Sequence, residues 1–418
     1  MDIVVGVIVG LLVLMALVTA HEFGHFIAAR RNGVKVLEFG IGFPPRAVAW
    51  VKDPKTKKWS RIKKEDWKKP QNGLVFSLNF LPIGGFCQMD GESANDSRKG
   101  TFGHARFLSK TKILFAGVLM NWLAAFLILT VLAWTGMPKF LENQFSVKYD
   151  ETYTKTPVLI SEVIAESPAE IAGLRAGDRL IAVGGNEVEI ATDVTKYNAE
   201  HAGQTVDYTI ERDEEVHADC DCPAEEECDC PTSVMAVEKI IPVKLNEKDA
   251  EYLAGIAMKS DQTLYHYTWS APVVGLGLTA QITGETFKGL GDLVWNVVSG
   301  IAKQFNPDTR EEGRAALDSA SDSVSGPVGI IGVIFPAFTS AGPANLAFLA
   351  ALISISLACM NVLPIPALDG GRWLLILFFK LRKKELTKEK EEKIVSRAFL
   401  VLLILVALIT ILDIRRFF

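Results

Sequence analysis

The chain has 418 residues, of which 49% are hydrophobic and 22% are charged, and its formal net charge is −5. This length is too great for one small core, so two or more domains are expected. The composition is unusually apolar for a wholly soluble protein with so many charges. It indicates very apolar segments alongside very polar ones.

Four apolar segments without any charge lie at residues 3–20, 113–137, 345–368 and 398–412. The first three are close to or above the ~20 residues that a helix needs to cross a bilayer, and Ile394 and Val395 extend the fourth. We therefore predict transmembrane helices at 1–30, 107–136, 345–379 and 394–414. The first has neither a basic start nor a small-residue cleavage site, so we interpret it as a permanent helix rather than a signal peptide.

Charge is distributed unevenly along the chain. Residues 140–345 contain 14 basic and 34 acidic residues, whereas the rest of the chain contains 30 basic and 15 acidic residues. Because basic loops stay in the cytoplasm, the first loop and residues 380–393 are expected there, with the central region and both termini outside. Arg415 and Arg416, at the outer C-terminus, fit this orientation less well.

The predicted cytoplasmic loop, residues 31–106, contains two expected strands at 36–51 and 73–90, with Gly and Pro at their turns. The sequence LVFSLNFLPIGGF is too apolar for a solvated loop. Irregular backbone is tolerated at membrane depth only where protein buries it, so we expect a membrane-associated β-hairpin. Its edge, including Gly84, Gly85 and Phe86, either receives an unwound substrate or only plugs the helix bundle.

A compact domain is expected at residues 155–262, where VLISEVIAESPAEIAGLRAGDRLIAVGGNEV alternates strands, a short helix and Gly turns. This pattern resembles a PDZ domain, an α+β fold. A Cys-rich insertion at 213–234 separates two neighbouring strands and contains Cys220, Cys222, Cys228 and Cys230. Outside the cytoplasm these cysteines favour disulfides; a metal site and free thiols are the alternatives. Residues 272–340 form an amphipathic and linker region, with a surface-lying helix at 272–305.

The motif HEFGH ends the first apolar segment. On a helix, His21 and His25 share a face and both can reach one metal ion, while Glu22 is placed to activate water. Ionisable residues at membrane depth indicate function. The alternative is a helix end that simply emerges into water beside Arg30 and Arg31.

The third apolar segment is interrupted by NVLPIPALDGG. Pro364 and Pro366 cannot continue a hydrogen-bonded helix, and Gly370 and Gly371 permit close backbone approach. Such a break can turn Asp369 toward a site, and the predicted topology brings it to the same membrane depth as His25. A catalytic zinc site uses three protein ligands, so Asp369 is the candidate third ligand. The alternative is a helix-end turn at the membrane surface.

Together, HEFGH, the PDZ-like domain and NVLPIPALDGG resemble the site-2 protease family, in particular the bacterial regulator-of-sigma-E proteases. FAGVLMNW, LNFLPIGGF and SGPVGI also match segments of that family. Val118 stands where proline is common, the single PDZ domain differs from members with two, and the Cys-rich insertion is unusual.

The resemblance implies a multi-pass α-helical membrane protein that acts as a zinc-dependent intramembrane endopeptidase in the bacterial inner membrane. His21, His25 and Asp369 would bind Zn²⁺, Glu22 would be the general base and acid, and Asn361 would lie near the oxyanion. From the residues alone, Asn361 could instead bond to Asn121. Expected partners are the lipid bilayer and single-pass substrates such as anti-sigma factors or signal-peptide remnants, with no nucleic acid.

Three other functions are compatible with parts of the pattern. Other membrane metalloproteases take a Glu as third ligand, but the third segment offers only Asp369. A catalytically inactive scaffold would not need the complete His-Glu-His-Asp set. A transporter would also use broken helices, but the chain has no inverted repeat.

Overall fold

The computed structural model describes residues 2–417 except 68, 70, 93–95, 142, 156–157, 189–190, 218–231, 249, 251, 260–262, 306–308 and 323–325. Its contacts define two compact units. The first consists of Met1–Glu151 and His266–Phe418, and the second of Thr152–Tyr265.

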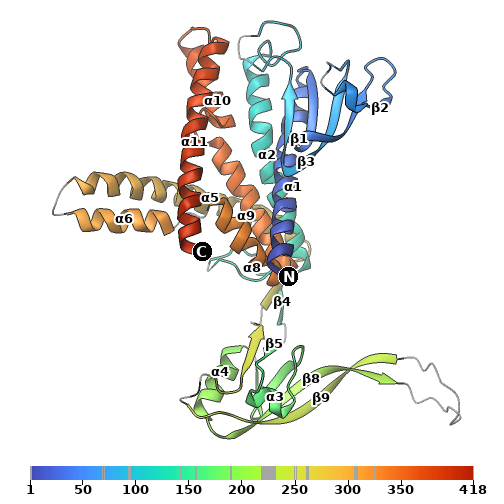
Figure 1. Cartoon of the computed structure of the whole chain (residues 1–418), viewed down its shortest axis with the longest axis vertical. Helices are drawn as coiled ribbons and strands as arrows, with labels where there is room; N and C mark the ends of the chain where they lie inside the picture. Colours follow the sequence, from blue (N-terminus) through green and yellow to red (C-terminus); the bar gives the residue numbers. More distant parts are fainter. Residues whose placement is uncertain are drawn as a thin grey trace, which may run out of the picture. The chain divides into compact units, whose positions relative to one another are not determined.

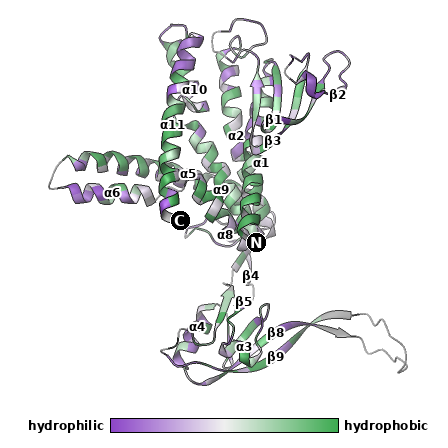
Figure 2. Cartoon of the chain, in the orientation of Figure 1, coloured by the Kyte–Doolittle hydropathy of each residue, from purple (hydrophilic) through white to green (hydrophobic). Residues whose placement is uncertain are grey.

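Four helices of the first unit are long and apolar enough to cross a membrane, which confirms the number predicted from the sequence. They are α1 (Asp2–Arg31), α2 (Phe107–Thr135), α9 (Pro343–Val362) and α11 (Lys388–Phe417). Long apolar runs favour helices in lipid because a helix satisfies all its backbone hydrogen bonds internally. Figure 2 shows that hydrophobic colour covers most of these helices.

The third predicted span, 345–379, is two helices rather than one. α9 stops at Val362, and α10 begins at Asp369 and continues to Leu381. Pro364 and Pro366 lie in the non-helical segment between them, where their missing N–H groups cost no helical hydrogen bond. α11 begins at Lys388, six residues before the predicted 394, because its charged first turns continue the apolar helix.

The loop between α1 and α2 forms a three-stranded sheet in the order β2-β1-β3 (Figure 1). Its members are β1 (Val36–Lys52), β2 (Trp59–Arg61) and β3 (Leu74–Met89). The short helix η1 (Lys64–Asp66) lies between β2 and β3 along the chain. Both long strands bend: Lys52 pairs with Leu74, Phe43 with Leu81, and Val36 with Met89. The sheet therefore has an apolar tip near Phe43 and Leu81 and a base where the strands begin and end.

A shared core holds this sheet against the helices. Phe26 and Ala29 of α1, Phe39 of β1 and Ile113 of α2 are all buried in one cluster, which also includes Ile376 of α10. Burial of a large apolar side chain contributes about 1.5–3 kcal/mol. This core lies directly next to the HEFGH segment of α1 and anchors the elements that surround it.

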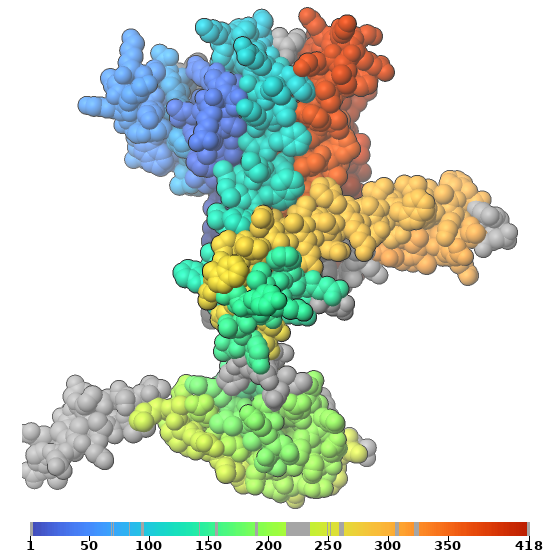
Figure 3. Space-filling model, turned by 180° about the vertical axis from the view of Figure 1, so that it is seen from behind, coloured from blue at the N-terminus to red at the C-terminus, as the bar shows by residue number. Residues whose placement is uncertain are grey.

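Between His266 and α9 along the chain, the first unit contains further helices. α5 (Ala271–Gln304) and α6 (Arg310–Asp322) pack against each other and extend from the bundle (Figure 3). Next come α7 (Pro327–Gly329), a π-helical turn (Ile330–Ile334) and α8 (Phe335–Ser340). The predicted linker to 340 thus ends in an apolar helix. It packs tightly on α1, since a Cβ at Gly6 would lie 2.4 Å from Pro336.

The second unit is an α+β domain with a six-stranded sheet in the order β10-β5-β6-β8-β9, in which β7 pairs with β6. Val158, Leu180, Tyr208 and Val243 lie in its buried core. Its elements are β4 (Thr152–Lys155), β5 (Val158–Val163), α3 (Pro168–Ala172), β6 (Arg179–Val183), β7 (Asn186–Glu187), α4 (Ala191–Glu200), β8 (Thr205–His217), β9 (Thr232–Lys244), β10 (Ile256–Lys259) and β11 (Thr263–His266).

The two strands that flank the Cys-rich insertion pair with each other, as predicted. Because their pairing extends to His217 and Thr232, the insertion is shorter than the predicted 213–234. Cys220, Cys222, Cys228 and Cys230 lie outside the described residues, so their disulfide, metal or thiol state stays a prediction.

Candidate metal centre

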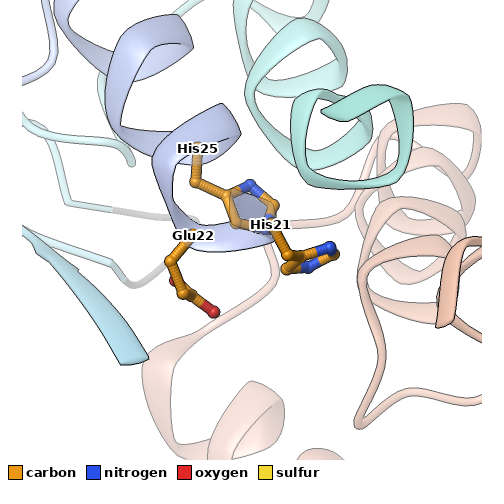
Figure 4. Close-up of side chains that lie close together, drawn as sticks. All are labelled: His21, Glu22 and His25. Atoms are coloured by element: carbon orange, nitrogen blue, oxygen red, sulfur yellow. The ribbon is translucent and has the colours of Figure 1, made fainter. Parts of the chain in front are cut away.

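The ligand atoms of His21, Glu22 and His25, all on α1, lie within 4.8 Å of one another. Both imidazoles are buried, and their Nε2 atoms are 3.1 Å apart. The helical spacing i, i+4 produces this approach, as the sequence predicted. Figure 4 shows the two rings close together, with the Glu22 carboxylate pointing to a separate side.

Asp369, the first residue of α10, reaches the same point from the other end of the chain. Its Oδ2 atom lies 3.1 Å from Nε2 of His21 and 3.2 Å from Nε2 of His25. The break between α9 and α10 makes this possible, since Asp369 begins a new helix instead of continuing the old one. Three ligand atoms from two distant segments therefore converge on one position.

Neighbouring groups orient both imidazoles. Nδ1 of His25 is 2.8 Å from the carbonyl oxygen of Ile113, and Nδ1 of His21 is 3.2 Å from the side-chain amide of Asn121. Each contact uses the ring nitrogen that faces away from the shared point, which leaves both Nε2 atoms directed toward it. Such outer contacts fix the ring orientation and the tautomer of metal-binding histidines.

Asn121 is fully buried, and its Oδ1 has no hydrogen-bond partner among the described residues. The two ends of an amide have nearly the same shape. Rotating this one by 180° lets Oδ1 accept a hydrogen bond from the Nδ1–H of His21, which satisfies both atoms. The sequence had suggested Asn121 only as a structural partner of Asn361, so its contact with His21 is new.

The space around the ligand atoms fits a small metal ion. A Cβ added to Gly117 of α2 would lie 2.5 Å from Nε2 of His25 and 2.7 Å from Nε2 of His21. Zinc bonds of about 2.0–2.1 Å require ligand atoms about 3.3 Å apart in a tetrahedral site. The observed 3.1–3.2 Å separations and the N, N, O ligand set match a catalytic zinc site with one open position.

The predicted hairpin lies against the same part of α1. A Cβ on Gly84 would lie 3.1 Å from Val18, and one on Gly85 would lie 3.2 Å from the hydroxyl of Thr19. Phe86 follows them in β3, and the backbone amide of Cys87 faces the Glu22 carboxylate. Among the described residues, 85–89 pair with 36–41 and with no other strand, so this part of β3 is an edge of the sheet.

Asn361, near the end of α9, does not bond to Asn121. Its side-chain amide donates to the carbonyl of Leu357, 3.0 Å away and one turn earlier in the same helix. The structural alternative that paired these two asparagines is therefore wrong. The amide nitrogen carries a second hydrogen that this bond does not use.

Comparisons with known proteins agree with this geometry. The model of peptidase family M50 matches residues 9–406. A protein of Clostridium perfringens, named as a zinc metalloprotease, is 28% identical over 98% of this chain and 98% of its own length. Zinc metalloprotease RasP of Bacillus licheniformis is 25% identical over 99% of both chains.

A largely buried cluster of two histidines on an apolar helix and one aspartate, with a glutamate beside it, fits a metalloprotease of the membrane. The chain belongs to peptidase family M50, the site-2 protease family, and is a zinc-dependent intramembrane protease. This membership favours a protease over the scaffold and the transporter that parts of the sequence allowed.

Replacing Asn121 by Leu will weaken zinc binding about 10–100-fold, the usual effect of losing an outer hydrogen bond to a metal ligand. The cause is the loss of the only side-chain contact recorded for Nδ1 of His21 among the described residues. Titration with a zinc-selective dye will measure the change. Asn361→Leu is the matched control and should leave zinc affinity unchanged; equal weakening in both variants would assign the effect to general destabilisation.

Proposed function

We propose that His21, His25 and Asp369 bind zinc and that the chain cleaves peptide bonds within transmembrane segments. One observation supports this most strongly. Two ligand atoms from α1 and one from Asp369, at least 344 positions later in the sequence, lie 3.1–3.2 Å from one another beside Glu22. When bound, zinc acts as a Lewis acid and lowers the pKa of water toward about 7.

Glu22 is the proposed general base and acid. Its carboxylate accepts a proton from the attacking water and then donates it to the nitrogen of the leaving amine. The residue is held on α1, one position from His21, so the helix fixes its position relative to both histidines. General acid–base catalysis of this type contributes about 10²–10⁴-fold to the rate.

Asn361 is the proposed donor to the oxyanion. Its amide has one hydrogen engaged by Leu357 and a second available to the substrate carbonyl. A preorganised donor to a developing oxyanion typically contributes about 10²–10³-fold. Asn361→Ala should therefore lower the rate per folded molecule. If only the stability of the fold changed, Asn361 would have no part in the chemistry.

The edge of β3 is the proposed binding surface for the unwound substrate. A helical substrate hides its carbonyls in its own hydrogen bonds, and adding it as a strand would extend it and expose the scissile bond. In the part of the chain that the structure describes, residues 85–89 have a strand partner on one side only, and the amide of Cys87 in this stretch faces Glu22. The geometry therefore supports a substrate role for Gly84, Gly85 and Phe86.

Replacing Gly85 by Val will reduce cleavage of a transmembrane substrate at least about 10-fold while zinc content stays the same. The added side chain must push the β3 edge away from Thr19, which lies within 3.2 Å of its first carbon, and from the Gly40 carbonyl oxygen at 2.9 Å. Turnover and zinc content are measured on the same purified sample. Gly289→Val is the control, because a Cβ there meets nothing within 4 Å; unchanged turnover in Gly85→Val would contradict the idea.

The second unit is proposed to be a PDZ domain outside the cytoplasm. The start and end of its short helix α3 support this. The Ser167 side chain accepts a hydrogen bond from the backbone amide of Glu170 at the start of the helix, and Gly173 ends the helix in a left-handed conformation. The domain would filter substrates by size or bind a C-terminal peptide. The charge distribution supports a metal centre toward the cytoplasm, in the bacterial inner membrane.

The proposed substrates are single-pass membrane proteins already shortened outside the cell, of the anti-sigma-factor or signal-peptide type, and the process is regulated intramembrane proteolysis. A Glu22→Gln variant that binds but does not cleave will retain such substrates. Affinity purification of this variant from membranes, followed by mass spectrometry, should recover transmembrane segments. Recovery of only soluble proteins would contradict the proposed substrate class.

A further inference from the structure

A second pocket lies at the base of the first sheet, away from the metal centre. It is a cavity of about 540 Å³ where α1 ends and where β1 and β3 begin. Arg30, Lys35, Lys52 and Lys57 contribute four positive charges to its lining, and Asp53 contributes one negative charge. We call this set the basic pocket. Its volume lies within the range of sites that bind small molecules.

The positive charges of the basic pocket are not neutralised by ion pairs among the described residues. None of the four basic side chains forms an ion pair within 4 Å in the described part of the chain. Arg30 lies over the ring of Phe26 and Lys52 over that of Trp59. Asp53 accepts hydrogen bonds from the backbone amides of Lys55 and Thr56, so its carboxylate is engaged by its own turn.

The position of the basic pocket indicates which kind of anion is available to bind there. Arg30 belongs to the last turn of the membrane-spanning helix α1, where basic residues lie at the lipid headgroups. At the opposite end of the same sheet, Phe43, Phe80 and Leu81 are exposed. The seven residue steps from Leu74 to Leu81 span about 23 Å, so the sheet has an apolar tip and a cationic base on the scale of one bilayer leaflet.

We infer that the basic pocket binds the phosphate of an anionic phospholipid headgroup. The apolar tip of the sheet and the end of α1 hold the pocket at headgroup depth, where such phosphates are abundant. Arg30 and the three lysines supply charge-assisted hydrogen bonds to the phosphate oxygens. Bound lipid would anchor the sheet, and residues 85–89 of β3 form the edge of this sheet that lies near the metal centre.

Binding of a fluorescent short-chain phosphatidylglycerol to the purified full-length chain, in neutral detergent micelles, tests this inference. The double variant Lys35→Gln/Lys57→Asn removes two charges from the pocket, and Asn suits the positive φ of Lys57. At about 1 kcal/mol for each basic residue near a lipid surface, the dissociation constant should rise about 30-fold. Arg30→Gln alone should raise it about 5-fold.

The control variant Lys55→Gln/Lys58→Gln removes two charges from the same turn, but these residues do not line the pocket. It should change the dissociation constant less than about 3-fold. Equal weakening in both double variants, or equal binding of phosphatidylcholine, would overturn the proposal. Binding of inorganic phosphate as tight as that of phosphatidylglycerol would overturn the assignment to a lipid. No proposed catalytic residue lies in the pocket, so this test is independent of the proposed function.

Discussion

Replacing Glu22 by Gln will lower the rate of cleavage of a transmembrane substrate by about 10²–10⁴-fold. The amide has nearly the shape of the carboxylate but cannot accept the proton of the attacking water. Zinc binding should persist, because the ligand atoms of His21, His25 and Asp369 converge without Glu22. The measurement is single-turnover cleavage in proteoliposomes, with zinc quantified by mass spectrometry on the same preparation.

Two controls make this result specific. Glu22→Asp keeps the charge on a shorter side chain and should recover part of the activity. Substrate should still bind to Glu22→Gln with unchanged affinity. If Glu22→Gln cleaved at the normal rate, another group would serve as the base; if it lost zinc, Glu22 would be a ligand instead.

Replacing Asp369 by Asn will lower zinc affinity by at least about 100-fold and remove activity with it. The carboxylate contacts both histidine Nε2 atoms, and a neutral amide is a much weaker ligand for zinc. Dialysis against a chelator of graded strength will measure the affinity. Added zinc in excess should restore part of the activity, which separates weak metal binding from misfolding.

Asp413 provides the matched control for Asp369. It is a buried carboxylate of α11 that accepts hydrogen bonds from the amides of Gly326 and Gly329, in a different part of the same unit. Asp413→Asn should lower thermal stability in detergent and leave zinc affinity unchanged. Equal zinc loss in both variants would show that any buried Asp→Asn change disturbs the metal centre.

The helical spacing of HEFGH was enough to predict one half of the metal centre. Residues four apart on a helix always share a face, and no tertiary contact is needed to bring His21 and His25 together. The helix break at Pro364 and Pro366 could also be predicted from the sequence, because proline cannot continue a helix. Charge-free segments similarly predicted all four apolar helices, since their length is imposed by the bilayer.

Other features depend on contacts between distant segments and left no local pattern. Asn121 was identified from the sequence only as a possible partner of Asn361, because nothing in α2 indicates that its side chain meets His21. The role of Gly117 is visible only once α1 lies against α2, where any side chain would enter the metal position. The helix at Pro327–Ser340 was predicted as linker because its apolar run is too short to read as a span.

The sequence by itself determined the membrane-spanning helices, the paired histidines and the break that releases Asp369. These follow from hydrophobic length, helical periodicity and the chemistry of proline, which act over short stretches of chain. Only the tertiary structure decided that Asp369 meets both imidazoles, that Asn121 and Ile113 orient them, and that four basic residues surround one pocket. Those relations join residues up to 348 positions apart, and packing alone brings such residues within reach of one another.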